Sequence, residues 1–413
     1  MGYSAGLISL FVLGFLGGEG RHGAAHADFY LYHLPAIEAF REGQWKDVVR
    51  NYSSATPPLF HILNSLNPLL GRDKAFRASN VGLSLGIYFL FVKLLCVRYG
   101  NIRGSKEWAW ITGGVLLLSP YFRAQAFWPM TDNLALLFVI LSALLIDVVT
   151  QHDEIRLPNF LHKLIVASVP LICLCAFYTR QIYLFLSCYA VVFLRAKLRR
   201  NKLFIFSSLL GLIPAWYLFA TWHGLTPPMF QERHEGFSLG ALLFPLVMIA
   251  FYATPFILEL ALEKAGNFVC LDRRIFIIVL VCISGATPFW LIFHRYLSTA
   301  YITNGGIVPS IFRMSGTACG PFLFFISAYL GLLILCFLGR RCSRYSNLLI
   351  FLFLISFLML KVDFQRYFDP ILLILFFGYI DRDITQKFVT LRAASILAAF
   401  ESILFLVEIV HNR

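Results

Sequence analysis

The stretch HADFYLYHLPAIEAF, residues 26–40, brings two acids and two histidines together in a chain that is otherwise very apolar. A carboxylate such as Asp28 and an imidazole such as His33 are groups that can accept or donate a proton during a reaction. Other interpretations remain open, since Asp28 could be a solvated loop acid or pair with Arg21, and His33 could only cap or pack a helix. The candidate chemistry of this segment is proton transfer.

Arginines recur in short polar segments farther along the chain. A guanidinium group binds phosphate through two parallel hydrogen bonds, so these side chains are candidates for holding an anionic substrate. Arg180 could instead anchor a helix at a membrane face, and Arg366 could pair with an acid of its own segment. Asp132, in WPMTDN, is best interpreted as the N-cap of a following helix. The candidate substrate-binding residues of these segments are Arg123, Arg180, Gln181, Arg295 and Arg366.

Composition places these residues in a membrane protein. The 413 residues are 59% hydrophobic and only 14% charged, and the mean hydropathy is +0.74. A soluble domain of this length needs more polar surface, so an integral-membrane protein is expected. The net charge of +13 does not indicate nucleic-acid binding, because Lys and Arg occur mainly in short loops between apolar runs. The nine cysteines mostly lie in apolar runs without a CxxC pair, and indicate neither disulfides nor a metal site.

Apolar runs predict an all-α bundle of 11 to 13 transmembrane helices forming one domain over residues 1–413. The first run reads as a transmembrane helix and not as a signal peptide, because no basic segment precedes it. The longest polar segment is the first loop, residues 19–76, and we expect no other soluble part. The predicted runs are 3–18, 77–97, 108–120, 131–150, 163–178, 181–195, 203–222, 239–262, 275–294, 318–338, 347–360, 367–380 and 391–411.

Charge predicts the orientation of this bundle. Short loops rich in Lys and Arg stay in the cytoplasm, and alternate loops of this chain are of that kind. The other loops are then expected to face the lumen or the periplasm, and they hold the candidate residues named above. They are 19–76, 121–130, 178–181, 223–238, 295–317 and 361–368. Polar chemistry on one membrane face indicates a reaction there with a substrate anchored in lipid.

The first loop also contains an amphipathic pattern. In YHLPAIEAFREGQW, Leu34, Ile37 and Phe40 recur at helical spacing, while the charged side chains fall on the other face. Pro35 suits the first turn of a helix. The pattern predicts a helix lying along the membrane interface, with Asp28 just before it.

These residues resemble those of a known superfamily. A long first luminal loop that opens with an acid and continues into an interfacial helix resembles the GT-C superfamily of polyprenyl-phosphate-sugar-dependent glycosyltransferases. YHLPAIEAFREGQW, YSSATPPLFHIL and YTRQIYLF are similar to segments of the family that adds the terminal α-1,2-glucose in N-glycan precursor assembly. The chain differs in having Asp28-Phe29 for Asp-Glu, one residue farther from His33-Leu34-Pro35, and Leu59 for a Gly. WPMTDNLALLF and QRYFDP suit bacterial relatives equally well.

The resemblance implies an inverting glycosyltransferase in the bacterial inner membrane or the endoplasmic reticulum membrane. Its partners would be a polyprenyl-phosphate sugar donor, a lipid-linked or glycan acceptor and membrane lipids, with no bound metal or other cofactor. Such a reaction needs a carboxylate to accept the acceptor's proton, the expected role of Asp28, and cations at the departing phosphate. The expected substrate-binding residues are His33, Arg180, Gln181, Arg366, Arg295 and Arg123.

A transporter or flippase of polyprenol-linked saccharides is the alternative function, and a scaffold without chemistry is a third. A transporter typically carries charged residues within its helices and internal repeats. Here only isolated cases such as Lys93 and Glu259 occur, and no repeat is visible.

Overall fold

The computed structural model describes residues 2–21, 23–43, 45–150, 158–197, 202–234, 236, 239–264, 306–314, 316–358 and 364–411. The elements in these ranges are helices, with no strand among them, so the predicted all-α fold is confirmed. Six helices are long and apolar enough to cross a membrane, which makes this a multi-pass membrane protein. They are α6 (Asp73–Tyr99), α9 (Thr131–Thr150), α11 (Asn159–Thr179), α13 (Lys202–Trp222), α15 (Leu239–Lys264) and α18 (Gly316–Gly339).

Shorter helices complete the bundle. Those of the N-terminal part are α1 (Gly2–Leu16), α2 (Ala24–Asp28), the π-helix η1 (Phe29–His33), α3 (Leu34–Arg41), α4 (Trp45–Arg50) and α5 (Leu59–Ser65). Those of the middle are α7 (Ser105–Gly114), η2 (Val115–Leu117), α8 (Pro120–Phe127), η3 (Gln181–Tyr183), α12 (Leu184–Lys197) and α14 (Pro228–His234). Those of the C-terminal part are α17 (Ile307–Met314), α19 (Arg344–Leu358), η5 (Gln365–Tyr367), α20 (Ile371–Tyr379), α21 (Arg382–Thr385), η6 (Gln386–Phe388) and α22 (Leu391–His411).

Most predicted apolar runs coincide with these helices, but several helices are too short to span a bilayer alone. Three apolar helices have only 10–17 residues, and the segments 382–388 and 391–409 form one bent pair with an angle of 77°. The predicted run 275–294 lies outside the described residues. The described part therefore has six spans, or seven if the bent pair is counted as one, against the 11 to 13 expected for the whole chain.

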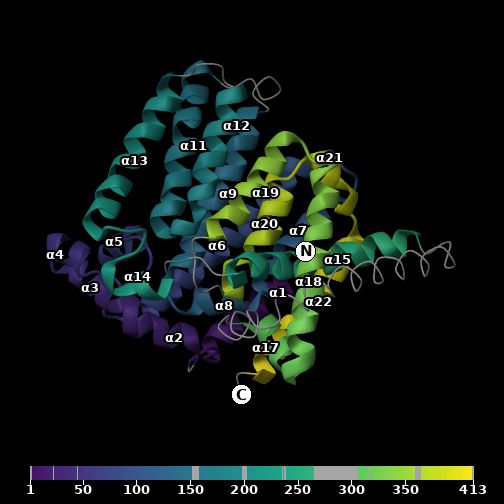
Figure 1. The fold of residues 1–413 in the computed structure, drawn as a ribbon, viewed down its shortest axis with the longest axis horizontal. Coiled ribbons are helices and arrows are strands. Elements are labelled where there is room, and N and C mark those ends of the chain that lie inside the picture. Colours follow the sequence, from purple (N-terminus) through teal and green to yellow (C-terminus); the bar gives the residue numbers. More distant parts are fainter. Residues whose placement is uncertain are drawn as a thin grey trace.

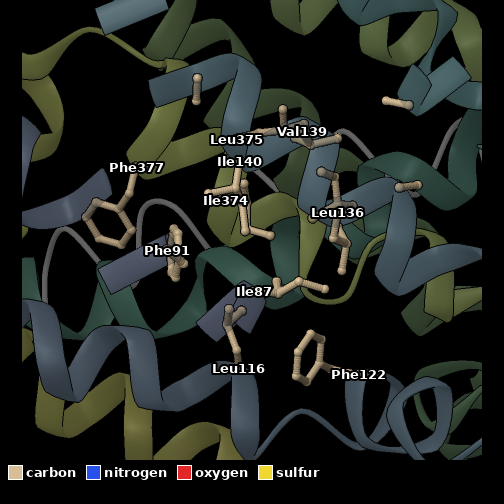
Figure 2. Packing of buried hydrophobic residues seen from close by; sticks show 14 of the residues in the cluster. Ile87, Phe91, Leu116, Phe122, Leu136, Val139, Ile140, Ile374, Leu375 and Phe377 are labelled. Carbon is tan, nitrogen blue, oxygen red and sulfur yellow. The ribbon is translucent and has the colours of Figure 1, made fainter. Parts of the chain in front are cut away.

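The core of the bundle joins α6, α9 and α20, which are far apart in sequence (Figure 2). Ile87 and Phe91 of α6 face Val139 and Ile140 of α9, and Ile374 of α20 lies beside them (Figure 2). All five side chains are fully buried. By contrast, α13 leaves large apolar side chains exposed, such as Trp216 and Phe206. Exposed apolar surface on a membrane helix is the surface that lipid covers.

Ion pairs and hydrogen bonds close one end of this core. Arg98 at the end of α6 lies 3.1 Å from Asp147 of α9 and also donates to carbonyl groups around the end of α20. Tyr99 bonds to Thr385 of α21 at 2.6 Å. In Figure 1, α21 lies at the upper right, whereas α2 to α5, α14 and α17 lie along the lower part of the molecule. The basic segment with α21 therefore lies at a different end of the molecule from α2 to α5, α14 and α17.

The amphipathic segment of the first loop forms η1 and α3, with Pro35 in the first turn of α3 as expected. Its apolar side chains Ile37 and Phe40 are fully buried, while Glu38 is exposed. They pack in clusters with residues of α5, α4 and α13, so protein covers the face for which lipid was expected. The amphipathic pattern is explained by burial against the bundle, because a membrane and a protein core select the same side chains.

Candidate functional site

The site begins with an ion pair between the first loop and the segment before α20. Arg366 Nη1 donates a hydrogen bond of 2.8 Å to Asp28 Oδ2. The side chain of Asp28 is 29% exposed and that of Arg366 is 24% exposed, so a ligand can reach both groups. Arg366 therefore pairs with Asp28 and not with Asp369 of its own segment, and Asp28 does not pair with Arg21. Asp363 lies outside the described residues.

A π-helical turn links Asp28 to His33. Helix α2 ends at Asp28, η1 covers Phe29–His33, and the amide of Leu34 bonds to the carbonyl of Phe29, five residues earlier. A π turn holds one more residue than an α turn, and such turns are frequent at functional sites. The turn thus carries the chain from Asp28 to His33 without ending the helix.

His33 belongs to a buried chain of hydrogen bonds. Its Nδ1 lies 2.8 Å from Nε2 of His61, and Nδ1 of His61 bonds to the hydroxyl of Tyr52. All three side chains are buried. Burial lowers the pKa of His33 to about 3, opposed by the nearby charge of Asp28 and reinforced by Arg366 and Arg180. Burial also lowers the pKa of His61. Both imidazoles are therefore neutral at physiological pH.

Arg180 lies at the turn between α11 and η3 and is almost fully buried. It forms an ion pair with Asp132 at the start of α9, and its guanidinium lies 4.5 Å from the ring centre of Tyr367. Asp132 is not the N-cap predicted from the sequence, because α9 begins at Thr131 and Asp132 lies within its first turn. The neighbouring Gln181 donates a 2.9 Å hydrogen bond to the carbonyl of Ala55, which ties the first loop to this turn.

A cavity adjoins these pairs where α8, α9, η3 and the segment before α20 meet. The space that it encloses is small, about 10 Å³, which is room for about one water molecule. Its lining includes Asp132 and Arg366 of the two ion pairs, and Asp369, which is 3% exposed. Burial raises the pKa of Asp369 to about 7. The full lining is Tyr121, Phe122, Gln125, Asp132, Asn133, Leu136, Tyr183, Arg366, Asp369, Pro370 and Ile371.

One predicted site residue that the structure describes, Arg123, is not part of this arrangement. Arg123 is fully buried, donates two hydrogen bonds to the carboxylate of Glu19, and donates a third of 3.0 Å to the carbonyl of Leu117. A Cβ atom at Gly14 would collide with Arg123 and Glu19, so the glycine makes room for the pair. This geometry makes Arg123 a structural link between α1 and α8. Arg295 lies outside the described residues.

Several residues of the site were missed by sequence reasoning. His61 and Tyr52 carry no signal beyond being polar residues in a long loop, and only the fold brings them to His33. Asp369 was expected as a salt-bridge partner of Arg366 or as an alternative base, and the structure buries it in the lining of the cavity. Among the described residues, no group of three or more His, Cys, Asp or Glu side chains is arranged to hold a metal ion.

Comparison of the chain with protein-family models, with curated proteins and with solved structures gives no match.

Proposed function

We propose that this protein is an integral-membrane inverting glycosyltransferase. It moves a sugar from a polyprenyl-phosphate donor to a lipid-linked or other glycan acceptor, on the lumenal or periplasmic face of the endoplasmic reticulum or bacterial inner membrane. The observation that carries the proposal is the ion pair of Asp28 and Arg366, an acid and a cation that are both reachable at one end of a membrane bundle.

The chemistry assigns a role to each partner of this pair. Asp28 accepts the proton of the acceptor hydroxyl while the hydroxyl oxygen bonds to the anomeric carbon. The bond from that carbon to the phosphate oxygen breaks at the same time, and polyprenyl phosphate leaves with the bonding electrons. Arg366 stabilises the charge that grows on the phosphate, because its guanidinium has several donors and its Nε has no partner in the described part of the chain.

His33 and Arg180 lie on the buried side of the Asp28–Arg366 pair and hold it in position. Both side chains are buried. The charges of Asp28, Arg366 and Arg180 all act on the pKa of His33, so these four side chains lie near one another. Arg180 is paired with Asp132, so its contribution is to hold the start of α9 and the ring of Tyr367 in place beside Arg366. Gln181 fixes the first loop to this turn.

The test is transfer by the purified protein in detergent. Radiolabelled polyprenyl-phosphate sugars are supplied one at a time with a lipid-linked acceptor, and labelled product is measured. Consumption of one donor only in the presence of acceptor supports the proposal. Absence of transfer from every donor, with a protein that remains folded, contradicts it.

A flippase for polyprenol-linked saccharides is the second candidate. It is favoured by acids buried within helices: Glu259 of α15, which bonds to Arg392 at 2.7 Å, and Glu401 of α22, which is 3% exposed. Reconstitution in liposomes separates the two functions. A flippase moves a fluorescent polyprenyl-linked saccharide between leaflets without altering it, whereas a transferase changes its covalent structure.

A further inference from the structure

Unpaired polar atoms are concentrated at the cavity beside the Asp28–Arg366 pair. Eleven buried side-chain atoms lack a hydrogen-bond partner among the described residues, and five of them belong to residues that line this cavity. An unpaired buried polar atom is costly, so such a concentration indicates a missing partner. The five atoms are Gln125 Oε1, Asp132 Oδ2, Asn133 Oδ1, Arg366 Nε and Asp369 Oδ2.

The orientation of the Asn133 amide is fixed by its neighbours. Its Nδ2 donates to the hydroxyl oxygen of Ser84 at 3.0 Å and to the carbonyl of Phe122 at 3.2 Å. The Ser84 hydroxyl already donates to the carbonyl of Asn80, so it can only accept from Asn133. Therefore the unpaired atom of Asn133 is an acceptor oxygen, and exchanging the amide oxygen and nitrogen would break two bonds.

Four of the five unpaired atoms are acceptors, so the missing partner must bring hydrogen-bond donors. A cation is disfavoured because Arg366 already lines the cavity, while Asp132 is matched by Arg180 and Asp28 by Arg366. Within the described part of the chain, Asp369 is the one acid of the lining that no ion pair joins to a cation. Neutral hydroxyl groups satisfy amide and carboxyl oxygens without adding charge.

We propose that this cavity receives a hydroxyl group of a carbohydrate, with Gln125, Asn133 and Asp369 as the candidate acceptors, and that it is part of the site that recognises the sugar. The inference rests on the proposed transferase function, which supplies a sugar next to Arg366. The cavity is lined on its apolar side by Phe122, Leu136 and Ile371. A hydroxyl group that enters it replaces the water lost from the acceptors.

The experiment compares two ligands that differ only by the sugar. Binding of a short-chain polyprenyl-phosphate glucose or mannose, and of the same polyprenyl phosphate without sugar, is measured for wild type and for Gln125→Met. Methionine keeps the length of glutamine and removes its acceptor oxygen. We expect the variant to bind the preferred glycosylated lipid about tenfold more weakly, and to bind the sugar-free lipid as wild type does. Asp369→Asn, which keeps the side-chain shape, should also weaken only the glycosylated ligand.

Gln386→Met is the matched control, because Gln386 is exposed in η6 at the other end of the bundle. Equal binding of the glycosylated lipid by wild type and Gln125→Met, or equal weakening of both ligands, overturns the inference while leaving the transferase function standing.

Methyl glucoside and methyl mannoside separate the two proposals. If no donor is transferred, yet one of these sugars raises the melting temperature of wild type and not of Gln125→Met, the carbohydrate site stands without the transferase. If neither sugar does so and no donor is transferred, both proposals fail. Stabilisation by NaCl that depends on Gln125 identifies a cation site and overturns the inference.

Discussion

Asp28 and Arg366 are joined by a hydrogen bond of 2.8 Å although 338 positions separate them in the sequence. The pair connects the first loop to the segment that leads into α20. It places an accessible acid against a cation at the end of the bundle where α3, α5 and α14 also lie.

Removing the acid tests its role as the base. Asp28→Asn keeps the size of the side chain and an oxygen for Arg366, but cannot accept a proton. We expect donor binding to persist and turnover to fall by roughly 10²–10⁴-fold. The measurements are donor affinity and the initial rate at saturating donor. Asp47→Asn, at an exposed position of α4, is the control. Turnover close to wild type in Asp28→Asn would transfer the role of base to another acid, with Asp369 the first to test.

Removing the cation tests phosphate binding. Arg366→Ala should weaken donor affinity by about 10–100-fold, because a charge-assisted hydrogen bond is lost. Arg366→Lys should recover only part of this, since an ammonium group keeps the charge without the two-pronged geometry. Arg72→Ala, at an exposed position beside α6, should bind donor as wild type does. Unchanged donor affinity in Arg366→Ala would exclude the arginine from the donor site.

Arg180 is expected to matter first for stability. Arg180→Met leaves Asp132 buried without its cation, and loss of one partner of a buried pair costs about 3–5 kcal/mol. The double variant Arg180→Met with Asp132→Leu should be more stable than the single variant, because no buried charge remains. Melting temperatures in detergent measure this, with Arg344→Met at an exposed position of α19 as control. A double variant less stable than both single variants contradicts the expectation.

The buried histidines predict a dependence of stability on pH. The pKa of His33 is about 3 in the folded protein against 6.5 for the free side chain. Between these values the unfolded chain binds a proton that the folded chain does not bind. Stability is therefore greatest above about pH 6.5 and falls as the pH decreases, by up to roughly 1.4 kcal/mol per pH unit from one such group.

Melting temperatures in detergent at pH 7.5 and pH 5 check this dependence. His33→Gln should lose less stability on acidification than wild type, because one of the groups that binds a proton only on unfolding is removed. His223→Asn, at an exposed position, should behave as wild type. An unchanged pH dependence in His33→Gln would mean that other groups cause it.

The arrangement of loops predicts their accessibility. In a cysteine-free background, Lys46→Cys in α4 and Met229→Cys in α14 should react with an impermeant thiol reagent from the same side of the membrane. Lys387→Cys in η6 should react only from the other side, because these positions lie at different ends of the bundle. Labelling of Lys46→Cys and Lys387→Cys from one side would contradict the proposed single face.

The sequence by itself determined the membrane class, the all-α fold and the position of most helices. Apolar runs of sufficient length have no other stable structure in lipid, because every backbone polar group must be satisfied within the segment. It also indicated which loops hold the polar chemistry, since those residues are rare in so apolar a chain. Local patterns sufficed for the amphipathic helix α3 and for Pro35 in its first turn.

Only the tertiary structure decided which charges are partners. Asp28 with Arg366, Asp132 with Arg180 and Glu19 with Arg123 are all pairs distant in sequence, and each carboxylate had a plausible local use. Which carboxylate pairs with which arginine depends on which loops the packing of α6, α9 and α20 brings to one end of the bundle. The spacing of residues within one segment does not show which distant segments will meet. The same packing gives Arg123 a structural role and not the predicted role in substrate binding. Its guanidinium is fully buried beside Glu19, so a substrate cannot reach it.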